Sequence, residues 1–209
     1  DIKELRGLEI SPDGNKITFG ATTRLQDILD FCRTIAPTLP QHKARFFEQL
    51  AERLQTFGST QIRNSATMVG NIACGGAVTD LSNFLIANQA IVSYVDPSVA
   101  NQEQTIGMDT FYKGNKSINL SPTSIITKVE MPLPSENEYM FVHKQAYRRD
   151  DDICICSATM KVNIDPSTNR IDDIQLAYSG LSAYPRNAKQ AEKFLLKKSF
   201  TLENIQQAY

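Results

Sequence analysis

The chain has 209 residues, of which 41% are apolar and 22% are charged, a composition typical of a folded protein rather than a disordered segment. Its 22 basic and 23 acidic residues leave a net charge of −1, which disfavours a nucleic-acid-binding protein because such domains carry a basic excess. No stretch approaches the roughly 18 consecutive apolar residues of a membrane-spanning helix. At about 150 residues per domain, the length allows one large domain or two small ones.

The chain start and the cysteines limit the class of protein further. Asp1 replaces a starting methionine and no apolar signal-peptide core follows, so we expect a segment excised from a longer protein. The cysteines Cys32, Cys74, Cys154 and Cys156 are too few for a disulfide framework and lack the paired spacing of zinc or iron–sulfur sites. We therefore expect buried apolar cysteines, no metal site and a reducing compartment.

The first sixty residues predict a hairpin followed by two helices. Residues 8–10 and 16–21 flank the turn sequence Pro12–Asn15 and read as two strands. Thr23 and Gln26 fit a capping box, which predicts a helix beginning there. The apolar spacing of the two helices predicts their buried faces, which are Leu25, Ile28, Leu29 and Cys32 in the first and Phe46, Phe47, Leu50, Ala51 and Leu54 in the second.

The middle of the chain has weaker patterns. Residues 58–79 have no helical or strand period, so they predict an irregular, glycine-rich loop. A short helix is predicted to begin near Asp80, and residues 90–95 and 124–131 predict strands separated by a polar stretch. The proline-rich segment 132–137 predicts a boundary, because proline removes backbone donors and ends elements.

The last part predicts strands and one main helix. Residues 139–147, 153–164 and 171–181 read as strands, and 186–198 as a helix, with another helix beginning at Thr201. In 153–164 alternate residues separate an apolar face from a polar one, with Ser157, Thr159, Lys161 and Asn163 on the polar face. We therefore predict an α+β fold, with an antiparallel-rich subdomain 1–134 and a smaller strand–strand–helix subdomain 135–209.

The glycine-rich loop suggests a binding function. Gly70 and the pair Gly75–Gly76 would let the backbone approach a ligand closely, and the small polar residues between them offer donors suited to a phosphate. Asp80 could accept hydrogen bonds from sugar hydroxyls. The alternative from composition alone is a surface loop with Asp80 as a helix N-cap, since the loop has no Walker-type lysine. A Rossmann site is disfavoured because the loop lacks G-x-G-x-x-G and no strand directly precedes it.

Two segments resemble a known family. The motifs Ile62–Asn64, Gly70–Ile72 and Thr79–Leu81 are similar to the second FAD-binding loop of the molybdenum hydroxylases, whose FAD-binding subdomain is of the PCMH type. The run Lys144–Ile153 resembles the K-Q-A-x-R-R-x-D-D-I segment of xanthine dehydrogenases more than that of aldehyde oxidases. The resemblance spans nearly the whole chain in the right order, and therefore implies a flavin domain.

The resemblance implies a set of FAD-binding residues. A loop around the FAD pyrophosphate would be formed by Thr67, Met68, Val69, Gly70 and Asn71. Asp80 would hold FAD hydroxyls, Phe57 would pack on the adenine, and Ile126 and Lys144 would lie beside the cofactor. Read from the residues alone, Phe57 and Ile126 could equally be core residues and Lys144 a solvated strand lysine.

The resemblance also implies a loop that controls access of the electron acceptor. Arg148 and Asp151 would lie in this loop beside the flavin, where an acidic group disfavours the reduced, anionic ring and repels the NAD phosphates. The alternative is a solvated, mixed-charge turn. No general acid or base is expected in the domain, because the flavin carries the electron chemistry.

Some features depart from the family pattern. Val69 replaces the first glycine of a Gly–Gly pair, residues 74–77 differ from those of animal xanthine dehydrogenases, and the family's first FAD loop would lie before Asp1. These departures leave three interpretations open. They are a fragment of an electron-transferring flavin domain, a catalytically silent scaffold and a stand-alone flavin subunit.

The resemblance to xanthine dehydrogenase or aldehyde oxidase implies what the complete enzyme contains. FAD would receive electrons from 2Fe–2S clusters and pass them to NAD or oxygen, while molybdopterin and the clusters lie outside this chain. The implied partners are other domains of the same polypeptide and a second copy of the full-length enzyme, with neither nucleic acid nor a membrane. The implied compartment is the cytoplasm, with the peroxisome as the alternative. The substrate, a purine or an aldehyde, would be selected elsewhere in the enzyme.

Overall fold

The computed structural model describes residues 2–208, so Asp1, on which the expectation of an excised chain partly rests, lies outside the described residues. The helices are α1 (Leu25–Ile35), α2 (Gln41–Gln55), α3 (Thr60–Arg63), α4 (Met68–Ala73), α5 (Ser82–Ala87), α6 (Lys189–Leu195) and α7 (Leu202–Gln206), with 3-10 turns at Lys3–Leu5 and Ala36–Thr38. The strands are β1 (Leu8–Ile10), β2 (Lys16–Gly20), β3 (Ile91–Asp96), β4 (Ala100–Gly107), β5 (Tyr112–Gly114), β6 (Ser117–Ile118), β7 (Ile125–Pro132), β8 (Glu138–Gln145), β9 (Cys156–Asp165), β10 (Arg170–Ser179) and β11 (Arg186–Asn187).

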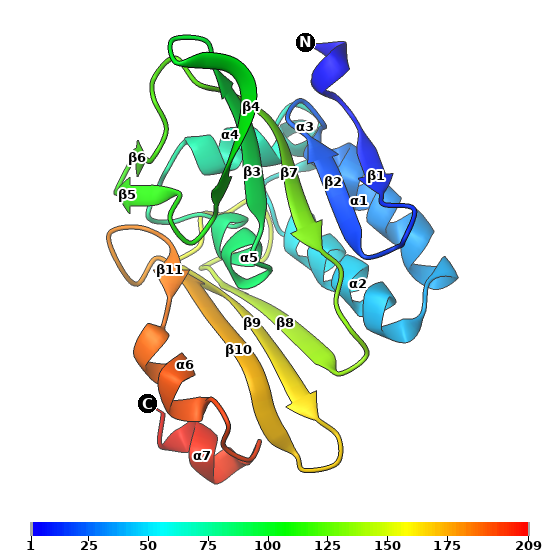
Figure 1. Ribbon diagram of the computed structural model, residues 1–209, viewed down its shortest axis with the longest axis vertical. Coiled ribbons are helices and arrows are strands. Elements are labelled where there is room, and N and C mark those ends of the chain that lie inside the picture. The colour runs from blue at the N-terminus through cyan, green and yellow to red at the C-terminus, as the bar shows by residue number, and fades with distance from the viewer. Residues whose placement is uncertain (1, 209) are drawn as a thin grey trace.

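A five-stranded antiparallel sheet forms the first part of the molecule. Its strand order is β1-β2-β7-β3-β4, with α1 and α2 lying behind it in Figure 1. Side chains of the sheet and both helices share one core, for example Phe19, Val129, Ile28 and Phe47. The predicted hairpin and the predicted strands at 90–95 and 124–131 are confirmed. The distribution of apolar residues did not predict β4 or the small β5–β6 hairpin, because the residues of these strands are mostly polar.

The predicted capping box at the start of α1 is wrong. Arg24 is the N-cap and makes no side-chain capping bond. Thr23 instead accepts a hydrogen bond from the Gly7 backbone N–H and donates one to the Gly7 carbonyl, which ties the helix start to the β1 segment. Gln26 bonds Asp30 and Arg63 instead.

The four-stranded antiparallel sheet, in the order β11-β10-β9-β8, lies below the first sheet in Figure 1. Helices α2 and α5 pack on one face, where Asn83 donates to Ser157 at 3.1 Å. Helix α6 packs on the other face, where Leu195 contacts a small cluster with Ile171 and Ile174. The predicted α+β class is confirmed.

The alternation predicted for strand β9 is present, but the polar face is the buried one. Ser157, Thr159 and Lys161 are all at most 6% exposed, whereas Met160 on the opposite face is exposed. Polar contacts make this arrangement possible, because Ser157 bonds the Thr79 carbonyl and Lys161 pairs with Glu138 at 3.1 Å. Hydrogen bonds therefore hold β9 against the Thr79 segment and helix α5.

Two helix predictions need correction. Residues 58–79 are not irregular, because they contain α3 and α4, whose N-caps Ser59 and Thr67 accept hydrogen bonds from Ile62 N and Gly70 N. Each helix is too short to show a period. The predicted helix 186–198 is shorter, since its first residues pair with β10 as strand β11. The helix predicted from Thr201 is confirmed, with Thr201 as its N-cap. No helix in residues 2–208 is long and apolar enough to cross a membrane.

Candidate functional site

A cleft of about 260 Å³ lies where the end of α2, helix α4 and the β8–β9 loop meet. It is lined by Phe57, Gly58, Ile62, Asn71, Val78, Thr79, Asp80, Asp151, Asp152, Ile153 and Cys154. The structure thus brings together four residues that the sequence singled out, namely Phe57, Asn71, Asp80 and Asp151. Ile62, Val78, Thr79, Asp152, Ile153 and Cys154 line the same cleft without having been predicted as site residues.

Helix α4 presents backbone donors beside Asn71. Just before the helix, the carbonyl of Ala66 accepts a hydrogen bond from Leu25 N at 2.9 Å, which fixes this segment against the start of α1. Thr67 caps the helix through Gly70 N, while the first two helical N–H groups, of Met68 and Val69, have no partner within the helix. A Cβ added at Gly70 would lie 3.2 Å from Thr67 Oγ1, so a larger residue would disturb this cap.

Asp80 is held in the cleft wall by a buried ion pair. Its Oδ2 lies 3.1 Å from Lys144 Nζ, and the two side chains are 14% and 7% exposed. Lys144 also donates to the Thr56 carbonyl at 2.8 Å, so the interpretation as a solvated strand lysine is wrong. Asp80 does not cap α5 either, because that helix begins at Ser82 after Leu81.

The second carboxylate oxygen of Asp80 is an unused acceptor. Asp80 Oδ1 is buried and has no hydrogen-bond partner among residues 2–208. A buried acceptor without a partner is costly, so a hydrogen-bond donor from water or a ligand would stabilise it. An acceptor at this position fits the sugar and ribityl hydroxyls of FAD, just as the N–H groups at the start of α4 fit its pyrophosphate. The residues present therefore fit the cofactor that the resemblance implies.

Arg53, which the sequence did not single out, lies buried behind the same wall. Its Nη2 donates to the carbonyls of His143 and Ala158, at 3.1 and 2.6 Å, which joins α2 to strands β8 and β9. Burial lowers the pKa of the guanidinium, and the negative charge of Asp80 opposes that shift. Burial, with a smaller effect of Asp80, also raises the pKa of Cys154 to about 11, so its thiol stays protonated at neutral pH. The sequence does contain a sign of this role, because Arg53 is a charged residue within the apolar stripe of α2.

Arg63 fixes the position of Phe57. Its Nη1 donates to the carbonyls of Gln55, Phe57 and Gly58 at 3.4, 3.1 and 3.2 Å. These contacts provide hydrogen-bond donors for backbone carbonyls that have no partner within α2 at its C-terminal end. Phe57 packs against the core and also lines the cleft, so its two interpretations from sequence are compatible.

The β8–β9 loop forms the acidic edge of the cleft. Asp152 accepts hydrogen bonds from the backbone N–H groups of Arg148 and Ile153, and the Arg148 bond is the main cause of its lowered pKa. Asp151 has a φ of +49°, a conformation that aspartate adopts more readily than most residues. Arg148 is largely exposed and donates to the Asp151 carbonyl. The loop therefore keeps a defined turn through its own polar contacts.

Other predicted residues lie outside the cleft lining. Met68 and Ile126 are core residues, 2% and 9% exposed, which agrees with the core interpretation of Ile126. Val69 packs against the core from within α4 and has a helical backbone, so the position does not need a glycine. That departure from the family pattern is therefore compatible with the loop's fold.

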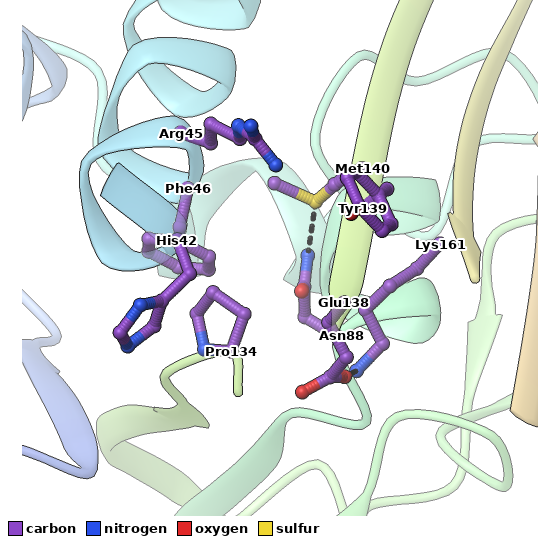
Figure 2. Close-up of a pocket in the computed structure, with 9 residues that line it drawn as sticks. All are labelled: His42, Arg45, Phe46, Asn88, Pro134, Glu138, Tyr139, Met140 and Lys161. Carbon is purple, nitrogen blue, oxygen red and sulfur yellow. Dashed lines mark hydrogen bonds and ion pairs between the residues drawn. The ribbon is translucent and has the colours of Figure 1, made fainter. Parts of the chain in front are cut away.

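A second hollow, shown in Figure 2, lies between the start of α2 and strand β8. Its volume is about 10 Å³, about the space of one water molecule. Asn88 closes one side by donating to the Met140 sulfur at 3.3 Å. This hollow is too small for a cofactor, which leaves the larger cleft as the candidate site.

Comparison with known proteins gives matches along nearly the whole chain. Residues 1–134 match the family "FAD binding domain in molybdopterin dehydrogenase", and residues 141–209 match the "CO dehydrogenase flavoprotein C-terminal domain". Xanthine dehydrogenase of Blastobotrys adeninivorans is 32% identical over 99% of this chain and 14% of its own length. Xanthine dehydrogenase/oxidase of Gallus gallus is 32% identical over 87% of this chain and 13% of its own.

Solved structures show the same fold. A chain of carbon monoxide dehydrogenase from Hydrogenophaga pseudoflava superimposes with a TM-score of 0.83 at 25% identity, covering 99% of this chain and 66% of that one. The chain spans only about 14% of the length of the curated xanthine dehydrogenases it matches. The family matches together cover most of the sequence, and this chain belongs to the FAD-binding domains of the molybdenum hydroxylases.

Proposed function

We propose that the chain holds FAD in this cleft and passes electrons, within a larger molybdenum hydroxylase of the xanthine dehydrogenase or aldehyde oxidase kind, from iron–sulfur centres to NAD or oxygen. The observation that carries the proposal is the unpaired acceptor Asp80 Oδ1, whose residue lines the same cleft as Asn71 of α4. FAD combines hydroxyls that donate hydrogen bonds with a pyrophosphate that accepts them. FAD supplies the electron-transfer chemistry, and the protein positions it and tunes its surroundings.

In this proposal the predicted residues divide by role. Thr67, Met68, Val69, Gly70 and Asn71 form the loop around the pyrophosphate. Asp80 binds hydroxyls, supported by Lys144, and Phe57 packs on the adenine. Ile126 supports the site from the core beneath it. A cleft of about 260 Å³ is below the usual range of small-molecule sites, so it accommodates part of a dinucleotide.

Access of the acceptor is proposed to depend on the β8–β9 loop. Asp151 and Asp152 line the cleft, and the pKa of Asp152 is lowered, so negative charge borders the bound flavin at neutral pH. This charge disfavours the reduced anionic ring and repels the NAD phosphates, while Arg148 at the same loop offsets it.

The remaining parts of the proposal concern the complete enzyme. Residues 1–134 and 135–209 form two subdomains of one flavin domain, joined to regions that hold the 2Fe–2S clusters and molybdopterin. The complete enzyme oxidises a purine or an aldehyde and forms a homodimer in the cytoplasm, or alternatively in the peroxisome. Its similarity to xanthine dehydrogenases over 99% of the chain supports this choice.

FAD content and affinity test the proposal. We expect purified full-length protein to contain FAD, and Asp80→Asn to weaken FAD binding about tenfold or more, as for loss of a hydrogen bond to a charged group. Asp172→Asn is the matched control, because that aspartate is exposed and belongs to a surface ion pair. Absence of FAD from a folded wild-type protein would refute the proposal and favour the silent scaffold.

The electron acceptor is tested separately. Bound FAD is reduced by illumination in the absence of oxygen with EDTA as the sacrificial electron donor. Its absorbance is then followed in the dark after adding NAD⁺ or oxygen. Reoxidation by NAD⁺ identifies a dehydrogenase, and we expect Asp151→Asn to speed that reaction relative to oxygen. An unchanged ratio would contradict the acceptor-access role of the loop.

A further inference from the structure

A chain of polar contacts runs from the cleft into the protein. Asn71 Oδ1 lies 2.8 Å from Thr79 Oγ1, which lies 3.2 Å from Ser82 Oγ. Ser82 Oγ lies 2.7 Å from Tyr112 Oη, which donates to the backbone carbonyl of Ile72 at 3.2 Å. Thr79, Ser82 and Tyr112 are buried, while Asn71 lines the cleft. Four contacts therefore connect three hydroxyls, one amide and one carbonyl.

The number of protons restricts how these contacts are made. Each hydroxyl has a single proton to donate, and a backbone carbonyl can only accept. The Ile72 carbonyl therefore takes the proton of Tyr112, Tyr112 takes that of Ser82, and Ser82 takes that of Thr79. Thr79 then has no proton left for Asn71. The fourth contact is a hydrogen bond only if Asn71 donates it.

The oxygen and nitrogen of an asparagine amide occupy nearly equivalent positions, so the hydrogen-bond network decides between its two orientations. With the oxygen toward Thr79, at most three of the four contacts carry a proton. With the nitrogen toward Thr79, all four do, and the oxygen then lies on the other side of the amide, away from Thr79. Buried hydroxyls favour the orientation that satisfies every member of the chain.

We propose that Thr79, Ser82 and Tyr112 form a positioning relay that turns the Asn71 carbonyl oxygen toward the cleft. Asn71 Oδ1 and Asp80 Oδ1 then offer two acceptors, which suit a ligand group with donors, such as the neighbouring hydroxyls of a sugar or polyol chain. Phosphate oxygens have no such donors at neutral pH, so the backbone N–H groups of α4 are left to bind them. This inference rests on the proposed FAD site. It keeps Asn71 in the loop around the pyrophosphate and adds that the Asn71 side chain accepts hydrogen bonds from neighbouring cofactor hydroxyls.

Side-chain amide NMR on the unliganded 209-residue chain tests the relay without FAD. The Asn71 signal is identified by its loss in Asn71→Asp. We expect one Asn71 amide proton to exchange slowly with water and to show a nuclear Overhauser effect to Thr79, because it is bonded to that buried hydroxyl. Fast exchange of both protons in the folded chain would overturn the proposal.

The relay also predicts the effect of distant substitutions. Tyr112→Phe removes the terminal donor and Ser82→Ala interrupts the chain, so each should abolish the slow exchange. In the full-length protein each should weaken FAD binding about three- to tenfold, the usual effect of one hydrogen bond. The double variant should match either single one, because a relay acts as a unit. Additive losses would refute the relay. Tyr94→Phe is the matched control, because the Tyr94 hydroxyl bonds Gln104 and takes no part in the relay.

The two proposals fail in different ways. A protected Asn71 proton in a protein that does not bind FAD supports the relay and refutes the proposed cofactor. FAD binding with an unprotected Asn71 amide supports the cofactor and refutes the relay. Weakened binding in Tyr112→Phe with unchanged amide exchange would also refute the relay, since the effect would then be general packing.

Discussion

The buried pair of Asp80 and Lys144 gives the most direct test of how the cleft wall is built. At 3.1 Å and an effective dielectric constant of about 20, two opposite charges attract each other by about 5 kcal/mol. Desolvation of both ions cancels part of that attraction. We therefore expect a coupling of about 2–3 kcal/mol between Asp80→Asn and Lys144→Met in a double-mutant cycle of unfolding free energies.

A second ion pair in the same chain serves as the control. Lys197 and Asp172 are closer, at 2.7 Å, but their side chains are 62% and 47% exposed. An exposed pair contributes at most about 1 kcal/mol, because water and salt screen it. Distance alone would make this pair the stronger one, whereas burial makes it the weaker one.

Urea unfolding of the four variants of each cycle at 0.15 M salt measures both couplings. The burial argument requires the coupling of the Asp80 pair to exceed that of the Asp172 pair and to change little when salt is raised. A coupling below about 0.5 kcal/mol for Asp80 and Lys144 would show that the pair is solvated and would refute the reasoning.

Two further predictions concern backbone geometry and pH. Gly180 has a φ of +87°, and a Cβ added there would clash with the Ile155 carbonyl. Gly180→Ala should therefore lower the free energy of unfolding, measured in urea, by about 2 kcal/mol or more. Gly76→Ala is the control and should cost far less, because no atom lies closer than 3.5 Å to the added Cβ. Asp96 has a pKa lowered to about 2, chiefly by hydrogen bonds from Ser98 and Thr123. Since the folded pKa lies below the unfolded value of 3.8, this stabilisation is complete above about pH 4 and disappears as pH falls to about 2. Asp96→Asn should therefore be less stable than wild type at pH 6 and equal to it near pH 2; a constant difference across this range would contradict the assignment.

The fold could be predicted where local patterns were long and regular. The apolar stripes of α1 and α2 and the strands β3, β7 and β10 follow periods of 3.6 or 2, and all of them form. The misses have a common cause, because α3 and α4 have only four and six residues and β4 is a mostly polar strand on an edge of its sheet. Such elements depend on capping and on pairing with neighbours, which a periodicity within one segment does not contain.

The site was predictable to the extent that its residues lie in recognisable motifs. Asn71, Asp80 and Asp151 come from two motif segments, and the fold brings them to one cleft. Arg53 and the contact of Ser82 with Tyr112 were missed because the partners are distant in sequence, as Arg53 is from the Ala158 carbonyl. Patterns in a single sequence show which residue types are present. The hydrogen-bonding roles of these residues depend instead on which groups come into contact in the folded protein.

The buried face of β9 explains why the polar residues at the site could not be assigned from alternation alone. Burial of an apolar face is the usual outcome, yet here Ser157 and Thr159 lie inside and Met160 lies outside. Ser157 donates to the Thr79 carbonyl and accepts from Asn83, so the polar face joins the second sheet to the segment that carries Asp80. Apolar packing would tolerate small shifts of β9 against this segment, whereas hydrogen bonds at about 3 Å fix β9 relative to Thr79 and α5. The proposed site takes its acceptors from α4 and the Asp80 segment and its acidic edge from the β8–β9 loop, so it requires these segments to keep fixed positions. The polar interface is therefore better explained by the geometry of the cleft than by the stability of the core.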